Sequence, residues 1–316
     1  MIRSTRRPVA LVISAALVTL LTSAAQGQSV PAMRTRYFTV LTNPEIDQYL
    51  KRNDVIFIPV GTVESMGAFP TDLEYVMAEA YALKMAEIAD GLVLPHVIFF
   101  YPGVTVTGRG SVYVPEDTGL TYLKAIAHSL LRQGFRRQIY ISAHGPSNQY
   151  VSALVREFFE ETKDPILYIE ASRLLRNAQT AGAAPQPSGT NNFRAVGYGA
   201  YGIVGRLSDV PLSLDIPKST ESPLPPPPAS IRKLSPLGPE SGAVGSYDPD
   251  GEHSSVRPLD VNITAAERAQ LARQGAELIE AAVNAMDVKG VIQALRDEDK
   301  YVNQIIVPRY KDLLPK

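Results

Sequence analysis

The stretch Val55-Ile-Phe-Ile-Pro-Val60, followed by Gly61-Thr-Val-Glu64, decides the fold class of this chain. Its first six residues are apolar and mostly β-branched or aromatic, and they lack the alternation of polar and apolar side chains typical of a half-solvated strand. The run therefore predicts a strand that is covered on both faces. Similar runs occur at 92–100, 138–142 and 166–169.

Helical patterns separate these runs. Apolar residues recur at helical spacing over 72–89, 116–131 and 149–162. Strands alternating with helices predict a three-layer α/β/α sandwich with a mostly parallel central sheet. A capping box from Thr264 to Glu267 predicts one more helix near the C-terminus.

The N-terminus predicts export. Three arginines within residues 3–7 precede an uncharged apolar run at 9–21, and small residues follow up to Gly27. This layout is typical of a signal peptide, here residues 1–27, and the paired arginines also resemble a twin-arginine signal. An uncleaved anchor is the alternative, although the apolar run is shorter than the roughly 20 residues that a membrane-spanning helix needs. We expect a periplasmic or secreted protein with one domain, 28–316, and a proline-rich loop region at about 211–239.

Composition excludes several classes of function. The chain has no cysteine, so disulfides, thiolate metal ligands and cysteine nucleophiles are ruled out. Without the leader, about 290 residues remain, enough for one large core. Loss of the three leader arginines changes the formal net charge from −1 to −4. A mildly acidic chain has no electrostatic footprint for nucleic acid or an anionic membrane, so we expect neither as a partner of the mature protein.

Three potential metal ligands follow the predicted strands. Glu64 comes after the first strand, Asp72 starts the next helix, and His144 follows the strand that ends at Ser142. Because the carboxyl ends of parallel strands meet at one edge of the sheet, these side chains can converge there. Two carboxylates and an imidazole suffice for one divalent metal, Zn or Mn, with positions left open for water. Taken singly, Glu64 fits a surface or helix-capping residue, and Asp72 fits an N-cap.

The ligands lie in two motifs. One is Gly61-Thr-Val-Glu-Ser-Met-Gly67 with Phe69-Pro-Thr-Asp72 after it, and the other is Ser142-Ala-His-Gly-Pro-Ser-Asn148. They resemble Gly-Ser-Thr-Glu-Gln-His-Gly and Asn-Gly-His-Gly-Gly-Asn-Asn of the creatininase family of metal-dependent amidohydrolases. The resemblance runs from about Asp54 to Asn148 and resumes near Gly242.

In that family two metals share a bridging Asp. The resemblance implies that Asp72 bridges, while Glu64 and His144 complete the first site. The second site would need a His where this chain has Met66. It would also need a Glu, either near His144, where the chain has Pro146, or in a later segment, where the chain has Tyr201. A thioether is a poor ligand for a hard divalent cation, so we expect one divalent metal or none.

The resemblance also implies a function. It predicts hydrolysis of a non-peptide or cyclic amide C–N bond in a small molecule by metal-activated water, in a ring-like homo-oligomer, often a hexamer. Ser147 and Asn148 are expected to bind substrate, with capping of the next helix as the alternative. The catalytic acid stays unknown, because Glu74 and Tyr201 are candidates only by their closeness in sequence. The other hypothesis is a non-catalytic descendant of the fold that binds a small molecule or a partner.

The stretch Gly197-Tyr-Gly-Ala-Tyr-Gly202 matches the dinucleotide-binding pattern by composition only. It follows a loop-like segment rather than a strand and opens no clear helix, so we expect no dinucleotide site there. Regular structure is expected to lapse after about Asn177.

Overall fold

The computed structural model describes residues 33–185, 192–214, 225, 228–233, 245, 247 and 262–315. The chain divides into two units, Met1–Arg34 and Thr35–Lys316, and all described helices and strands belong to the second. The predicted signal peptide, 1–27, and much of the predicted proline-rich region, 211–239, lie outside the described residues.

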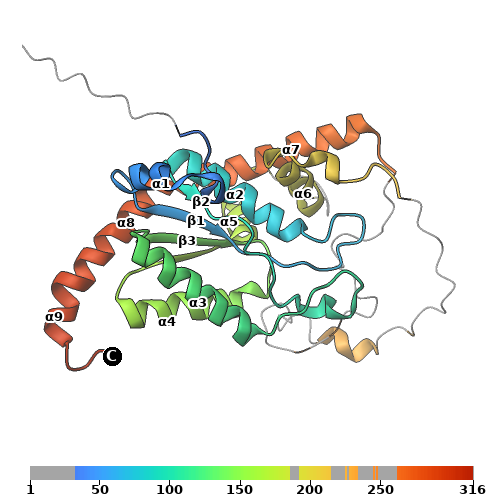
Figure 1. Ribbon diagram of the computed structural model, residues 1–316. Coiled ribbons are helices and arrows are strands. Elements are labelled where there is room, and N and C mark those ends of the chain that lie inside the picture. Colours follow the sequence, from blue (N-terminus) through green and yellow to red (C-terminus); the bar gives the residue numbers. More distant parts are fainter. Residues whose placement is uncertain are drawn as a thin grey trace, which may run out of the picture. The chain divides into compact units, whose positions relative to one another are not determined.

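The described residues form one parallel sheet of order β2-β1-β3-β4 (Figure 1). Its strands are β1 (Val55–Pro59), β2 (Leu92–Val93), β3 (Arg137–Ser142) and β4 (Leu167–Glu170). Val55 pairs with Arg137 and Pro59 with Ile141. All residues of β1 and β3 are buried, as the unalternated apolar runs predict.

The second strand is much shorter than the predicted 92–100. It ends at Val93 because Pro95 lacks a backbone N–H, and His96 has a φ of 73°, which is incompatible with an extended strand. Beyond it, only the single bridge between Val60 and Val97 continues the pairing.

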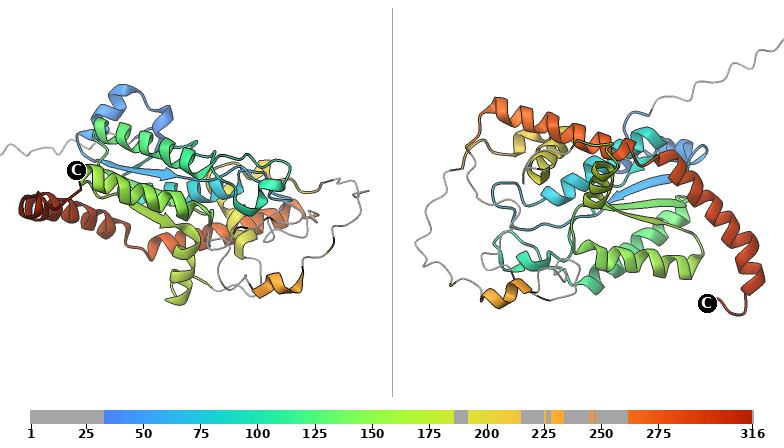
Figure 2. Two further views of the ribbon diagram at one scale, coloured as in Figure 1. Left: turned by 90° about the horizontal axis from the view of Figure 1, so that it is seen from below. Right: turned by 180° about the vertical axis from the view of Figure 1, so that it is seen from behind.

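Helices cover both faces of the sheet. The chain moves one way from β1 to β2 and the other way from β2 to β3 and β4. Right-handed crossovers therefore place α2 on one face and α3 and α4 on the other, which confirms the predicted three-layer α/β/α sandwich (Figures 1 and 2). The helical segments are η1 (Phe38–Val40), α1 (Asn43–Leu50), α2 (Leu73–Ala89), η2 (Gly103–Thr107), α3 (Glu116–Gln133), α4 (Ser147–Thr162), α5 (Ala171–Thr180), α6 (Asn192–Ile203), η3 (Leu207–Asp209), η4 (Ala229–Lys233), α7 (Ala265–Asn284), α8 (Val288–Tyr301), the π-helical η8 (Val302–Ile306) and α9 (Val307–Tyr310).

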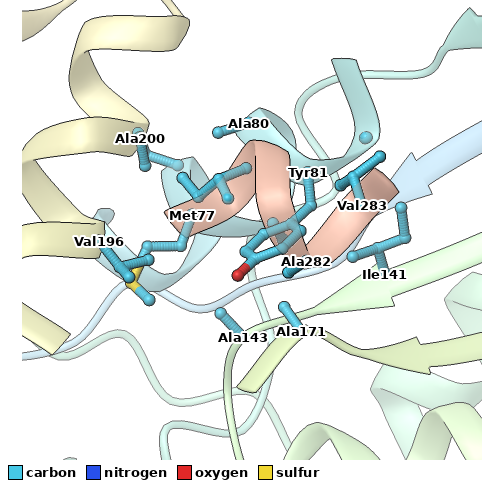
Figure 3. Packing of buried hydrophobic residues seen from close by; sticks show 14 of the residues in the cluster. Met77, Ala80, Tyr81, Ile141, Ala143, Ala171, Val196, Ala200, Ala282 and Val283 are labelled. Atoms are coloured by element: carbon cyan, nitrogen blue, oxygen red, sulfur yellow. The ribbon is translucent and has the colours of Figure 1, made fainter. Parts of the chain in front are cut away.

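Helix α2 is the centre of the core. All its residues from Leu73 to Ala82 are buried, because it lies between the sheet on one side and α6 and α7 on the other. Figure 3 shows Met77 and Tyr81 of α2 among side chains of α6, of α7 and of the carboxyl edge of the sheet. Among the helices that the structure describes, none has the length and apolarity needed to cross a membrane.

Helix α6 corrects the expectation of irregular structure after Asn177. The glycine-rich pattern lies inside this helix, where Gly199 faces Gly275 of α7. A Cβ on Gly199 would lie 2.4 Å from the backbone N of Ala276, so the glycines allow the two helices to approach closely. Glycine disfavours helices in isolation, and here tertiary packing overrides that propensity. The pattern therefore serves helix packing, away from any strand-to-helix turn.

Candidate metal site

The first candidate ligand, Glu64, is positioned by a close approach of two chain segments. Where β1 ends, a Cβ on Gly61 would lie 2.5 Å from Cα of Tyr75 in α2, so only glycine fits. The chain then turns at the carboxyl edge of the sheet, and the amide of Glu64 donates to the carbonyl of Thr71 at 2.9 Å. The Glu64 side chain is thereby buried at this edge, with 1% exposed.

Two further candidate ligands approach Glu64 from α2 and from the end of β3. Glu74 is the second residue of α2 and is 3% exposed, and His144 follows β3 and is 2% exposed. The Nε2 atom of His144 lies 3.6 Å from Oε1 of Glu64 and 3.9 Å from Oε2 of Glu74. One ligand atom from each of the three residues lies within 4.8 Å of the other two. In a tetrahedral shell with ligands at about 2.1 Å, neighbouring ligand atoms are roughly 3.4 Å apart, so this spacing is close to that of a metal centre.

The charges of the three residues also fit a cation. Two carboxylates that lie this close together away from water repel each other, and burying them is costly unless positive charge is nearby. Oε1 of Glu64 is buried without a hydrogen bond from the described residues. This oxygen could coordinate a divalent cation, whose charge would offset both carboxylates. Two oxygens and one imidazole nitrogen suit Zn or Mn.

A chain of hydroxyl groups orients the imidazole. Nδ1 of His144 lies 3.1 Å from Oγ of Ser147, which also accepts from Ser142 at 3.0 Å and contacts the Tyr150 hydroxyl at 2.6 Å. If Ser147 donates to Tyr150, its two lone pairs are available for Ser142 and for the Nδ1–H of His144. That tautomer leaves the lone pair of Nε2 facing the two carboxylates. Burial raises the pKa of Tyr150, so its hydroxyl stays protonated.

The η2 turn closes the other side of the site. Oγ1 of Thr105 is 2.5 Å from Oε2 of Glu64, which leaves Oε1 directed at His144. Gly103 has a φ of 70°, and a Cβ there would lie 2.8 Å from Cγ of Pro146 and 3.9 Å from Nε2 of His144. Neither Thr105 nor Gly103 stands out in the sequence as part of the site. A glycine and a threonine in a loop are too common a pattern to signal such a role.

The structure places Asp72 outside this set, and Glu74 takes the place expected for it. Successive residues of a helix are about 100° apart around its axis, so side chains two positions apart point in nearly opposite directions. Asp72 instead accepts a hydrogen bond from the Tyr201 hydroxyl at 2.5 Å and another from Nη1 of Arg206 at 2.7 Å. Its side chain makes no capping bond to α2. The structure therefore brings Glu74, rather than the predicted Asp72, beside Glu64 and His144.

Comparison with known proteins identifies the family. Residues 39–193 match the family model described as Creatininase: creatinine amidohydrolase. This chain belongs to the creatininase family. A relative from Thermotoga maritima, described as 3-dehydro-scyllo-inosose hydrolase, is 32% identical over 116 residues, which are 34% of this chain and 36% of that protein. The match therefore spans about a third of that relative's length.

Solved creatininase structures share the fold. A structure described as creatininase with Mn is 16% identical, with a TM-score of 0.54 over 84% of this chain and 99% of that one. A creatininase variant described as Zn–Zn type is 17% identical, with a TM-score of 0.53 and the same coverage. A putative creatinine amidohydrolase from Bacteroides fragilis is 15% identical, with a TM-score of 0.52 over 85% of this chain and 98% of that one. At these identities the likeness establishes the fold.

Met66 and Tyr201 stand where the family resemblance leads us to expect ligands of a second metal. Met66 is 1% exposed and belongs to the hydrophobic core. Tyr201 is fully buried, and burial together with the Asp72 carboxylate raises its pKa, so it stays a hydrogen-bond donor. Across the part of the chain that the structure describes, the group of Glu64, Glu74 and His144 is the only set of three or more such side chains close enough to hold an ion.

The two predicted substrate-binding residues begin α4. Ser147 is fully buried, and its hydroxyl orients His144 as described above. Asn148 is exposed, and its Oδ1 accepts from Oγ of Ser152 at 2.8 Å. Neither side chain makes a capping bond at this helix start, where Pro146 holds the N-cap position. Contact of either residue with a substrate stays a prediction.

Proposed function

We propose that this protein is an exported hydrolase that cleaves a non-peptide or cyclic amide C–N bond with one divalent metal, Zn or Mn, held by Glu64, Glu74 and His144. The observation that carries the proposal is the convergence of these three buried ligand atoms within 4.8 Å at the carboxyl edge of the sheet. Family membership and the manganese and Zn–Zn creatininase structures support the choice of reaction and metal.

The metal, when bound, would supply an activated water and a Lewis acid for the amide carbonyl. The residues of the chain do the remaining work. Three protein ligands leave a coordination position open, as catalytic rather than structural sites do. Thr105 holds one oxygen of Glu64, and Ser147 holds the imidazole ring, so both ligands are preorganised. Burial of the ligands limits competition from bulk water.

The two sequence candidates for a general acid are both engaged elsewhere. Glu74 lies among the proposed ligands, and Tyr201 donates to Asp72. Proton delivery to the departing nitrogen therefore needs another group or the solvent.

A second candidate function is a non-catalytic, metal-containing member of the family that binds a small molecule or a partner. The burial of all three candidate ligands, at 1 to 3% exposure, favours it, because a buried site gives a substrate little access. The absence of a histidine at Met66 also fits this candidate.

Metal analysis of the purified mature protein tests the proposal. After removal of metal and reconstitution with Zn or Mn, we expect about one bound ion per chain, as one three-ligand site allows. His144→Ala should lose this ion, whereas His128→Ala should retain it, because His128 lies on α3 and contacts Glu161 at 2.8 Å. Binding of only a small fraction of an equivalent would contradict the proposal.

Hydrolysis separates the two candidates. Loaded protein is screened against small cyclic amides and formamides, with His144→Ala and His128→Ala measured beside it. Turnover that disappears only in His144→Ala supports the enzyme. Stoichiometric metal without turnover, combined with saturable binding of one of the amides, supports the non-catalytic candidate.

Location and assembly also form part of the proposal. The leader pattern at 1–27 supports export to the periplasm or beyond, through the general or the twin-arginine route. N-terminal sequencing of the exported protein should begin after Ala25 or Gly27, and light scattering should detect a ring-sized homo-oligomer such as a hexamer. An intact N-terminus or a monomer would contradict the respective part.

A further inference from the structure

A cleft lies at the amino end of β1, away from the candidate metal site. Its volume is about 410 Å³, within the range typical of small-molecule sites. The turn at Arg52, the end of α2 at Asp90 and one face of α8 enclose it. Figures 1 and 2 show α8 beside this end of β1. Because β1 is five residues long, the cleft lies roughly 15 Å from Glu64, so its occupant would not touch the proposed metal.

Positive charge dominates the lining of the cleft. Arg52, Lys289 and Arg296 line it together with a single acid, Asp90, whereas the whole chain has a net charge of −1. Asp90 is shared, because it accepts from Arg52 at 3.0 Å and from Arg36 at 2.6 Å. Burial opposes ionisation of Asp90, but the two guanidinium groups hold its pKa below the usual value. The negative charge of Asp90 is therefore already balanced by Arg36 and Arg52.

The remaining cations have little compensation. Arg296 donates to Asp54 at 2.9 Å and to Asn53 at 3.0 Å, and Asp54 is itself 3.7 Å from Arg137. Lys289 is exposed and has no ion-pair partner among the described residues. The amino edge of the sheet therefore presents a local excess of positive charge around a cavity of ligand size.

The spacing of the cations defines the ligand. Lys289 and Arg296 are seven residues apart on α8, so they lie on one face, about 10 Å apart along the axis. A single anion would reach both only if the two long side chains bent toward each other. Two anionic groups at opposite ends of one small molecule would pair with both directly. Guanidinium groups match the planar geometry of carboxylates.

We propose that this cleft binds a small dicarboxylate, with one carboxylate at Lys289 and the other between Arg296 and Arg52. The site is separate from the proposed metal centre and does not depend on the proposed function. It faces solvent, so a ligand can enter without movement of the core.

Isothermal titration with succinate at constant ionic strength tests this proposal. We expect saturable binding of succinate and much weaker binding of acetate, which carries one carboxylate. Lys289→Glu should weaken succinate binding by about ten-fold or more, because it replaces an attractive charge by a repulsive one. Lys300→Glu is the matched control on the same helix, since Lys300 is 64% exposed and lies outside the cleft.

Three outcomes would overturn the proposal. They are the absence of saturable succinate binding, equal affinity for acetate and succinate, and equal weakening by Lys289→Glu and Lys300→Glu. The exposed Gln293 also lines the cleft, so Gln293→Glu provides a second test with little risk to folding. It should weaken succinate binding in the same direction as Lys289→Glu.

Discussion

Asp72 and Glu74 lie only two residues apart at the start of α2, yet their charges meet different surroundings. Asp72 is bound by the guanidinium of Arg206 and the phenol of Tyr201. Glu74 lies beside a second buried carboxylate, that of Glu64, and the imidazole of His144. The first acid has the contacts of a structural ion pair. The second has those of a metal ligand.

The comparison shows how to distinguish a structural acid from a candidate ligand. Both residues are acids after the same motif, so residue type and position in the chain do not separate them. Separation comes from the partners that the fold supplies. A carboxylate matched by arginine needs no metal, whereas two buried carboxylates facing one imidazole nitrogen are stabilised by one.

Replacement of Glu74 should have the largest effect. Glu74→Gln removes one proposed ligand. Loss of a residue that only supports a ligand lowers metal affinity by about 10–100-fold, so we expect a larger fall in Zn or Mn affinity here. The metal-free variant should unfold at higher urea than metal-free wild type, because the repulsion between two buried carboxylates is gone. Titration calorimetry and urea unfolding measure the two effects. Unchanged metal affinity in Glu74→Gln would refute the assignment.

The next effect is expected from the glycine that faces the imidazole. Gly103→Ala should destabilise the fold by about 1–2 kcal/mol from its left-handed backbone alone, and more from collision with Pro146. Gly205→Ala is the matched control, because Gly205 has a φ of 76° and no atom within 4 Å of an added Cβ. Urea unfolding and metal titration compare the two variants. Equal losses in both, with unaltered metal affinity, would show that Gly103 does not shape the site.

Removal of the charge of Asp72 should have a smaller effect. Asp72→Asn keeps an acceptor for Tyr201 but loses the ion pair with Arg206, whose side chain is 39% exposed. We expect a loss of about 0.5–1 kcal/mol in stability and unchanged metal stoichiometry, since partly exposed ion pairs contribute little. Asp209→Asn, which changes the other acid bound to Arg206, is the control for the arginine. Loss of metal in Asp72→Asn would instead restore Asp72 to the ligand set.

The smallest expected effect depends on pH and concerns Glu79. This residue lies about two helical turns after Asp72, on the same face of α2. Burial raises the pKa of Glu79, against the opposing influence of Tyr37, Arg206 and His96. Since the folded pKa lies above the unfolded one, the related stability is present at low pH and is lost as pH rises through the folded pKa.

Glu79→Gln should therefore gain stability relative to wild type as pH rises, and the difference should shrink in acid. Thermal unfolding of both proteins from about pH 4 to about pH 8 measures this difference, because that window covers the titration of a raised carboxyl. A difference that stays constant with pH would show that Glu79 does not titrate in this range.

Much of the architecture follows from local patterns. The runs at 55–60 and 138–142 lack polar–apolar alternation, which indicates strands buried on both faces. The helices observed at 73–89, 116–133 and 147–162 agree with the apolar periodicity of those segments. The positions of Glu64 and His144 after parallel strands place them at one edge of the sheet. These features depend on contacts and spacings close in the chain.

The sequence by itself determined the layered α/β fold and brought Glu64 and His144 to the same edge, because strand and helix periodicities are local properties. Only the tertiary structure brought Glu74, rather than Asp72, beside Glu64 and His144, because this depends on which way the first turn of α2 faces the sheet. It alone placed Thr105 against Glu64 and brought Gly199 against Gly275. These contacts join segments distant in the chain, and no local pattern encodes them.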